Sequence, residues 1–153
     1  MRRLLALLFL LGSLAGSPAA DTSTGRVIKV LPLFLDSQGR AALTPSLFDR
    51  DAYQAYLRQH TNEISAVRFD VLWQAADAGG GRLKLRLDLR GGGTIGLPSE
   101  AMLEQAFVPG HSRCWTSLAL DGVDFKNFGS LVAWRATLWS DDRLLAEQKS
   151  FLW

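Results

Sequence analysis

The amino-acid sequence predicts a mainly β protein, folded as an antiparallel β-sandwich in a single domain at 26–153. Three observations predict this class. Apolar and polar residues alternate with a period of two in several short segments, and turns rich in glycine or aspartate separate these segments. Only two segments have helical spacing, a longer one at about 47–60 and a short one at about 99–107.

Residues 1–20 precede this domain and have the three-part pattern of a secretory signal peptide. Two arginines are followed by the uninterrupted apolar run Leu4–Leu11 and then by small residues that suit a cleavage site. The apolar run is shorter than the about 20 residues that a membrane-spanning helix needs. We expect export to the periplasm or the extracellular space, no transmembrane span after cleavage, and a flexible tail at 21–25.

The charge balance argues against nucleic acid as a partner. Removal of residues 1–20 takes away two arginines and no acidic residue, which leaves 15 basic and 15 acidic side chains. Binding to nucleic acid phosphates requires a surplus of basic residues on one surface. The rest of the chain is long enough for one ordinary domain with its own hydrophobic core.

The first strand is expected at 26–35, where β-branched and aliphatic residues predominate. Pro32 lies inside this segment. Because proline has no backbone N–H for the ladder, this strand belongs at a sheet edge or carries a bulge.

The longer helix is the only substantial one that the sequence predicts. Ser46, with Asp49 three residues later, forms an N-terminal capping pair. The apolar residues of the helix fall at helical spacing on one face, namely Phe48, Ala52, Ala55 and Tyr56.

Two alternating segments at 64–76 and 82–90 are expected to form a hairpin around a glycine-rich turn at 78–81. The second segment has the clearest alternation in the chain, because its leucines share one face and its charged residues share the other. The residues expected to face inward there are Leu83, Leu85, Leu87 and Leu89.

Three elements are expected between this hairpin and the last one. The short helix at 99–107 is predicted from four apolar residues that fall on one side. A strand follows at 113–121, and 122–130 is expected to be a loop whose two phenylalanines cap the core. The apolar residues of the short helix are Met102, Leu103, Ala106 and Phe107.

The last hairpin is expected at 131–153, with a final strand that runs to the C-terminus. A two-residue loop at Asp141–Asp142 pairs Trp134 with Lys149, whereas a three-residue loop pairs Trp134 with Ser150. We favour the second register, because it sets small residues opposite large ones.

The two tryptophans of this hairpin have different expected roles. Trp134 lies in the core, and Trp153 closes the edge of the last strand. Because pairing to the end of the chain buries apolar area, deletion of 151–153 is expected to lower stability sharply.

The number of strands supports the sandwich. Six segments are convincing strands, and 94–97 supplies a seventh if it pairs. Many short antiparallel strands with one inserted helix fit an immunoglobulin-like architecture. The Cys…Trp…Cys spacing of immunoglobulin domains is absent, so the likeness is one of architecture only.

Few residues suggest catalysis or metal binding. The two histidines are His60 and His111, and His111 lies three residues before Cys114, the single cysteine. A structural zinc site needs four ligands, and a Cys–His nucleophile needs an orienting third group. We expect a free Cys114 in the core, no enzymatic activity, no cofactor and no metal.

Candidate partner-binding residues lie on two expected strands. A basic row that projects from one strand face suits an anionic glycan, lipid headgroups or an acidic partner, unless neighbouring acids balance it. Exposed aromatic residues of the last hairpin suit stacking on sugars or packing on a protein. The basic row is Arg82, Lys84, Arg86 and Arg90, and the aromatic residues are Trp139, Phe151 and Trp153.

The sequence therefore predicts an exported binding or structural module whose partner is a protein or glycan of the cell envelope. The second class is a small outer-membrane-associated β protein, because Phe151 and the terminal Trp153 resemble the C-terminal signature of bacterial outer-membrane barrel strands. Glu147 and Lys149 interrupt that pattern, and a barrel needs at least eight strands of about ten residues. A third class, an envelope hydrolase, has no set of catalytic residues to support it.

Overall fold

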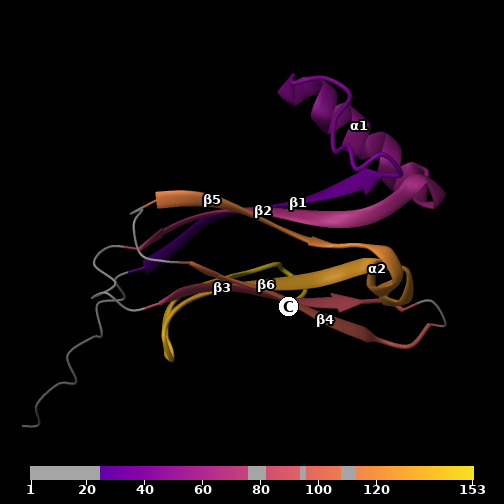
Figure 1. Ribbon diagram of the computed structural model, residues 1–153. Helices are drawn as coiled ribbons and strands as arrows, with labels where there is room; N and C mark the ends of the chain where they lie inside the picture. Colours follow the sequence, from indigo (N-terminus) through magenta and orange to yellow (C-terminus); the bar gives the residue numbers. More distant parts are fainter. Residues whose placement is uncertain (1–24, 76–81, 94–95, 108–112) are drawn as a thin grey trace, which may run out of the picture.

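The computed structural model describes residues 25–75, 82–93, 96–107 and 113–153. The expected signal peptide, the glycine-rich turn at 78–81 and His111 lie outside these residues. The described chain forms two stacked β-sheets, with one helix standing beyond them (Figure 1).

Both sheets are antiparallel. The three-stranded sheet has the order β1 (Gly25–Asp36), β2 (Ile64–Ala75), β5 (Arg113–Leu120). The four-stranded sheet has the order β4 (Ser99–Phe107), β3 (Leu83–Gly91), β6 (Leu131–Ser140), β7 (Arg143–Lys149). The helices are α1 (Leu47–Gln59), the 3-10 turn η1 (Thr61–Glu63) and α2 (Gly122–Phe128).

The mainly β sandwich that the sequence predicts is confirmed. Its immunoglobulin-like topology is not confirmed. In the seven-stranded constant-type arrangement the fourth strand lies beside the fifth in one sheet. Here β4 hydrogen-bonds to β3, while β5 hydrogen-bonds to β2 in the other sheet.

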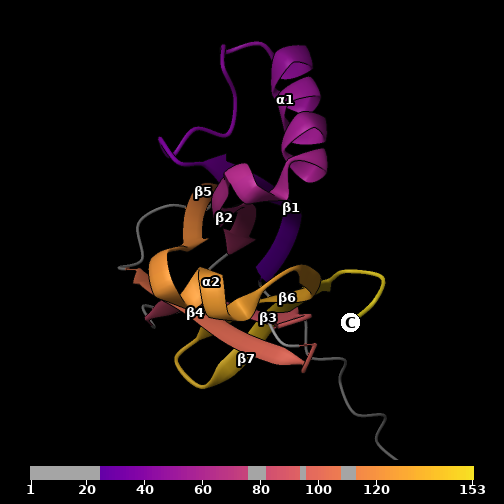
Figure 2. The ribbon, with the colours of Figure 1, turned by 90° about the vertical axis from the view of Figure 1, so that its right-hand side faces the viewer.

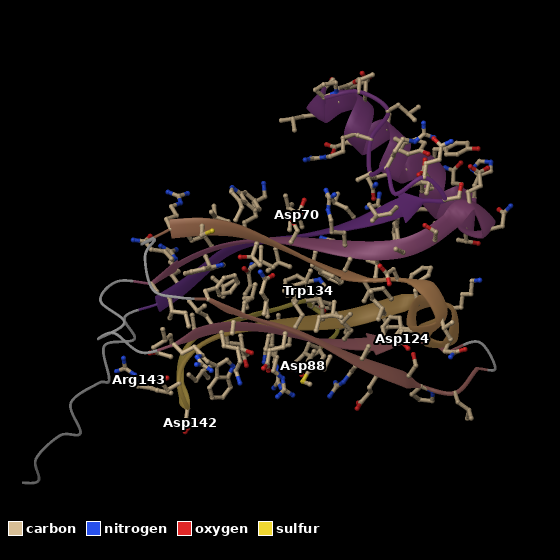
Figure 3. The ribbon with its side chains drawn as sticks, viewed as in Figure 1. Asp70, Asp88, Asp124, Trp134, Asp142 and Arg143 are labelled. Carbon is tan, nitrogen blue, oxygen red and sulfur yellow. The ribbon has the colours of Figure 1, made fainter. Side chains whose placement is uncertain are left out.

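The hydrophobic core lies between the sheets, because each strand turns alternate side chains inward. The four leucines of β3 are at most 2% exposed, as their alternation predicts. Phe69 on β2 is fully buried. Figure 3 shows Trp134 between the two sheets, where it packs against the core. Cys114 is free and packs there also, although it is only partly buried.

The position of Pro32 agrees with the sequence analysis. Strand β1 is an edge strand of the three-stranded sheet, and its pairing with β2 has a bulge between Val27 and Lys29. A missing N–H donor is tolerated at such an edge.

The expected hairpin between 64–76 and 82–90 is wrong. Strand β2 has β1 and β5 as its neighbours, and β3 has β4 and β6, so the two segments lie in different sheets. Alternation identifies the buried face of a strand, but it does not identify the neighbouring strand.

The expected short helix at 99–107 is also wrong, because this segment is β4. Its residues pair in an unbroken ladder with β3, from Leu83 opposite Phe107 to Gly91 opposite Ser99. The backbone hydrogen bonds and the core contacts of Leu103 and Phe107 outweigh the weak helical preference of the segment.

The segment expected to be a loop at 122–130 contains α2. Its two phenylalanines cap the core as expected, since Phe128 is 3% exposed within the core cluster and Phe125 packs against that cluster. The helix ends at Phe128 and is capped by Gly129, whose positive φ of 74° suits glycine.

The last hairpin combines features of both expected registers. Ser140 pairs with Arg143 across a two-residue turn, in which Asp141 adopts a positive φ of 49°. A shift in the pairing between Leu138 and Trp139 then brings Ser150 opposite Trp134, as in the register that we favoured. The strand does not reach the terminus, because β7 ends at Lys149 and a turn follows.

Candidate interaction surface

The basic row lies on the outer face of the four-stranded sheet. Lys84, Arg86 and Arg90 alternate with the buried leucines of β3, and Arg82 directly precedes this strand. Asp88 shares this face and points away from the three-stranded sheet (Figure 3).

Acidic side chains neutralise three members of this row. Two of the three partners come from β4, and because a helix is expected there from the sequence, these pairs are not predictable from it. The ion pairs are Lys84–Glu104 at 3.4 Å, Arg86–Asp88 at 2.7 Å and Arg90–Glu100 at 3.9 Å. The outer face is therefore a surface of mixed charge rather than a cationic stripe.

Asp88 links two neighbouring strands on this face. Its carboxylate accepts hydrogen bonds from Arg86 on its own strand and, at 2.9 Å, from Arg135 on β6. Burial raises the pKa of Asp88, but the hydrogen bonds from both arginines outweigh burial and hold this pKa below its usual value.

The two candidate tryptophans lie at opposite ends of β3. Trp139 pairs with Lys84 near the start of the strand. Trp153 lies under Arg90 near its end, with the guanidinium carbon of Arg90 at 4.1 Å and that of Arg135 at 4.9 Å from the ring centroid. These cation–π contacts fasten the C-terminus to the sheet face.

Replacement of Trp153 by alanine is expected to lower the free energy of unfolding by only about 1 to 2 kcal/mol, the range of cation–π contacts and partial burial. A sharp loss does not follow, because the terminal residues are outside the β7 ladder and Phe151 is fully exposed. Chemical denaturation measures the change, and complete unfolding of the variant at pH 7 would contradict it.

A second surface is formed by the insertion between β1 and β2, residues 37–63, which we call the arm. The arm contains α1 and stands at one end of the sandwich, beyond the three-stranded sheet (Figure 2). Ser46 caps α1 as predicted, with its hydroxyl oxygen accepting from the Asp49 N–H at 3.4 Å.

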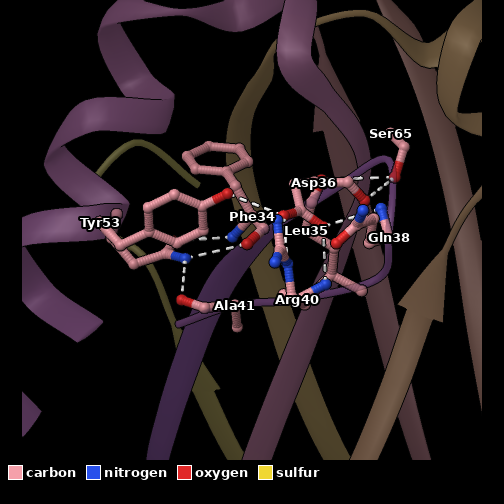
Figure 4. Close-up of polar contacts among 9 residues, drawn as sticks. Phe34, Leu35, Asp36, Gln38, Arg40, Ala41, Tyr53 and Ser65 are labelled. Carbon is pink, nitrogen blue, oxygen red and sulfur yellow. Dashed lines mark hydrogen bonds and ion pairs between the residues drawn. The ribbon is translucent and has the colours of Figure 1, made fainter. Parts of the chain in front are cut away.

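Asp36 fixes the base of the arm (Figure 4). Asp36 is only 4% exposed, and its carboxylate accepts four hydrogen bonds. The backbone N–H groups of Gln38 and Arg40 donate to Oδ1 at 2.8 and 2.9 Å. The Arg40 guanidinium and the Tyr53 hydroxyl donate to Oδ2 at 2.8 and 2.7 Å. Burial raises the pKa of Asp36, but these hydrogen bonds outweigh burial and hold it far below its usual value.

Gln54 attaches α1 to the edge strand β1. Its amide group accepts from the Phe34 N–H at 2.8 Å and donates to the Phe34 carbonyl oxygen at 2.9 Å, as a neighbouring strand would. The same amide donates to Ala41 in the loop of the arm at 2.9 Å (Figure 4). Because Gln54 is 2% exposed and Leu57 is fully buried, the inner face of α1 is fixed.

The apolar face of α1 points the other way and is exposed. We call Phe48, Ala52, Ala55 and Tyr56 the arm stripe, which is the set at helical spacing in the sequence. All four are exposed, and Phe48 is 82% exposed. Leu43 and Leu47 add to this surface, and a groove of about 700 Å³ lies between the loop of the arm and α1.

Tyr56 is held in place although it is exposed. Its ring stacks on His60 with centroids 4.0 Å apart, and its hydroxyl donates to Glu63 at 2.7 Å. This hydrogen bond raises the pKa of the Tyr56 phenol. An aromatic ring that is already ordered loses little conformational entropy when a partner packs on it.

Helical spacing in the sequence predicts the residues of the arm stripe but not the attachment of the arm. No pattern in the sequence singles out Asp36 or Gln54. A signal for the outward orientation of the stripe was present, since the face opposite the stripe carries Gln54 and Leu57 and so has little apolar surface of its own.

Comparisons of the chain with models of protein families, with curated proteins and with solved structures find no match. None of the described helices is long and apolar enough to cross a membrane. The described residues contain no group of three or more His, Cys, Asp or Glu placed to hold a metal ion.

Proposed function

We propose that the protein is an exported, non-enzymatic binding module of the cell envelope that holds a protein partner through its arm. The observation that carries this proposal is the exposure of the arm stripe on a helix whose opposite face is fixed by Gln54 and Leu57. An amphipathic helix that presents its apolar residues to solvent is a common means of protein recognition.

Burial of the arm stripe by a partner would be favourable in free energy. Burial of apolar surface contributes about 25 cal/mol per Å², so full burial of a side chain such as Phe48 favours association by about 1.5 to 3 kcal/mol. Clustered exposed apolar residues mark interaction sites more often than single ones do. The outer face of the four-stranded sheet is a weaker candidate, because its charges are already paired.

Export is supported by residues 1–20, whose pattern is that of a cleaved secretory leader. We expect the protein to be released with the soluble envelope contents or the medium, and its N-terminus to begin near residue 20. Recovery only in detergent-extracted membranes would instead favour the outer-membrane-associated alternative.

The partner-binding role is tested by photocrosslinking in cells that express the protein. A photoreactive phenylalanine analogue in place of Phe48 is expected to give a discrete protein adduct. The same analogue in place of Asp142, in the turn at the far end of the sandwich (Figure 3), is the matched control and is expected to give none. Absence of an adduct at position 48, or identical adducts at both positions, would overturn the proposal.

A further inference from the structure

We infer that the partner on the arm stripe is a second copy of this chain, with α1 packed antiparallel against α1 of that copy. This inference rests on the proposed function and adds the identity of the partner. The inference rests on the charged residues beside the stripe. The charges of one α1 complement those of the second α1 only when the two helices are antiparallel.

Asp51 and Arg58 lie on the same flank of α1. They are seven residues apart, and seven residues make almost two turns, so both side chains project along one side of the stripe. Asp51 has a side chain that is 72% exposed, and Arg58 is also exposed. Asp51 pairs with the adjacent Arg50 at 2.8 Å, and the guanidinium carbon of Arg58 lies 5.8 Å from the ring centroid of Phe34 on β1. Both side chains nevertheless stay exposed to a partner.

When a two-fold axis relates two antiparallel copies of α1, the charges on this flank of one copy are complementary to those on the same flank of the other. In an antiparallel helix pair each flank meets the same flank of the partner with its direction reversed. Asp51 then faces the partner's Arg58, and Arg58 faces the partner's Asp51. In a parallel pair each flank would instead meet the opposite flank of the partner, so Asp51 and Arg58 would not face each other.

The shape of the stripe suits the same arrangement. Ala52 and Ala55 lie near the middle of α1 and allow the two helix backbones to approach closely, while Phe48 and Tyr56 lie on either side of them. The macrodipoles of antiparallel helices also attract. Two acidic and two basic residues, Asp49, Asp51, Arg50 and Arg58, leave α1 without net charge, so no overall repulsion opposes the pairing.

The expected affinity is moderate. One helix face with Leu43 and Leu47 beside it is small compared with the about 800 Å² per partner of a standard stable interface. A dissociation constant on the order of 1 to 10 μM is therefore expected.

Sedimentation of the purified protein between about 1 and 100 μM, a range that spans this affinity, tests the inference. The wild type is expected to pass from monomer to dimer. Asp51→Arg and Arg58→Asp are each expected to weaken the dimer by about tenfold or more, because like charges then meet at both ends of the interface. The double variant, D51R with R58D, is expected to restore it. Asp142→Arg is the control at the far end of the sandwich.

Circular dichroism confirms that each variant is folded. A wild type that stays monomeric throughout this range, or a double variant as weak as the single ones, would overturn the dimer. If the adduct at position 48 then contains a different protein, the binding role of the arm stands and only the second copy is wrong. If position 48 gives no adduct, the proposed function fails with it.

Discussion

Replacement of Phe69 by alanine is expected to lower the free energy of unfolding by about 3 to 5 kcal/mol, the usual range for a buried phenylalanine. Phe69 is fully buried on the central strand β2, where it lies between Pro32 of β1 and Leu118 of β5. Loss of the ring removes apolar contacts and leaves a cavity. Hydrogen-bonded strands on both sides prevent the backbone from closing that cavity.

The matched control is Phe151→Ala, because Phe151 is the same residue type and is fully exposed. Its free energy of unfolding is expected to stay within about 0.5 kcal/mol of the wild-type value. Denaturant titrations followed by tryptophan fluorescence compare the two variants. Equal losses would show that Phe69 is not part of the core.

Replacement of Asp36 by asparagine is expected to lower the free energy of unfolding by about 2 to 4 kcal/mol at pH 7. The amide has nearly the same shape, but it carries no charge and offers one acceptor oxygen instead of two. Its NH₂ group then faces either donors of the backbone or the donors of Arg40 and Tyr53. Asp142→Asn in the exposed hairpin turn is the control and is expected to have little effect.

The Asp36 effect should depend on pH. The folded-state pKa of Asp36 is far below its value of about 3.9 in an unfolded chain, so the unfolded state binds more protons between the two values. The contribution of the carboxylate is therefore fully present above about pH 4 and is lost as the pH falls through the folded-state pKa. The difference between wild type and Asp36→Asn should shrink below about pH 4, and a constant difference down to pH 2 would contradict the role assigned to the carboxylate.

The strands were predictable where one face is buried and the other is exposed to solvent. The period of two at 82–90 predicts both the strand and its buried face, because neighbouring residues there differ sharply in polarity. At 131–140 it predicts the strand but not the whole buried face, because Val132 is exposed and its neighbour Ala133 is buried. Strand β4 was not predictable in this way. Its outward residue Met102 is 55% exposed and its inward residues are only partly buried, so apolar residues stand on both faces and imitate helical spacing.

The order of the strands in the two sheets could not be predicted from the sequence. Strands β2 and β3 follow each other across a glycine-rich segment, which is the pattern of a hairpin. Whether such a turn joins two neighbours or crosses between sheets depends on which other strands fill the edges, and that is decided by contacts far apart in the chain.

The candidate surface was only half predictable. Helical spacing identified the arm stripe, but an apolar stripe on a helix ordinarily faces the core of its own domain. Its exposure depends on Gln54, whose amide takes the place of a strand at the open edge of β1. A pairing between one side chain and a distant backbone leaves no periodic pattern in the sequence.

The orientation of α1 is tested most directly by hydroxyl-radical footprinting with mass spectrometry, on protein diluted below the concentration at which it associates. Phe48, at 82% exposure, should be oxidised nearly as fast as Phe151, and Phe69 should be protected. At high concentration, where the protein associates, the oxidation rate of Phe48 should fall, whereas the rates of Phe151 and Phe69 should not change. Protection of Phe48 to the level of Phe69 in the dilute protein would contradict the outward orientation of the arm stripe, because its apolar face would then be packed on its own sandwich.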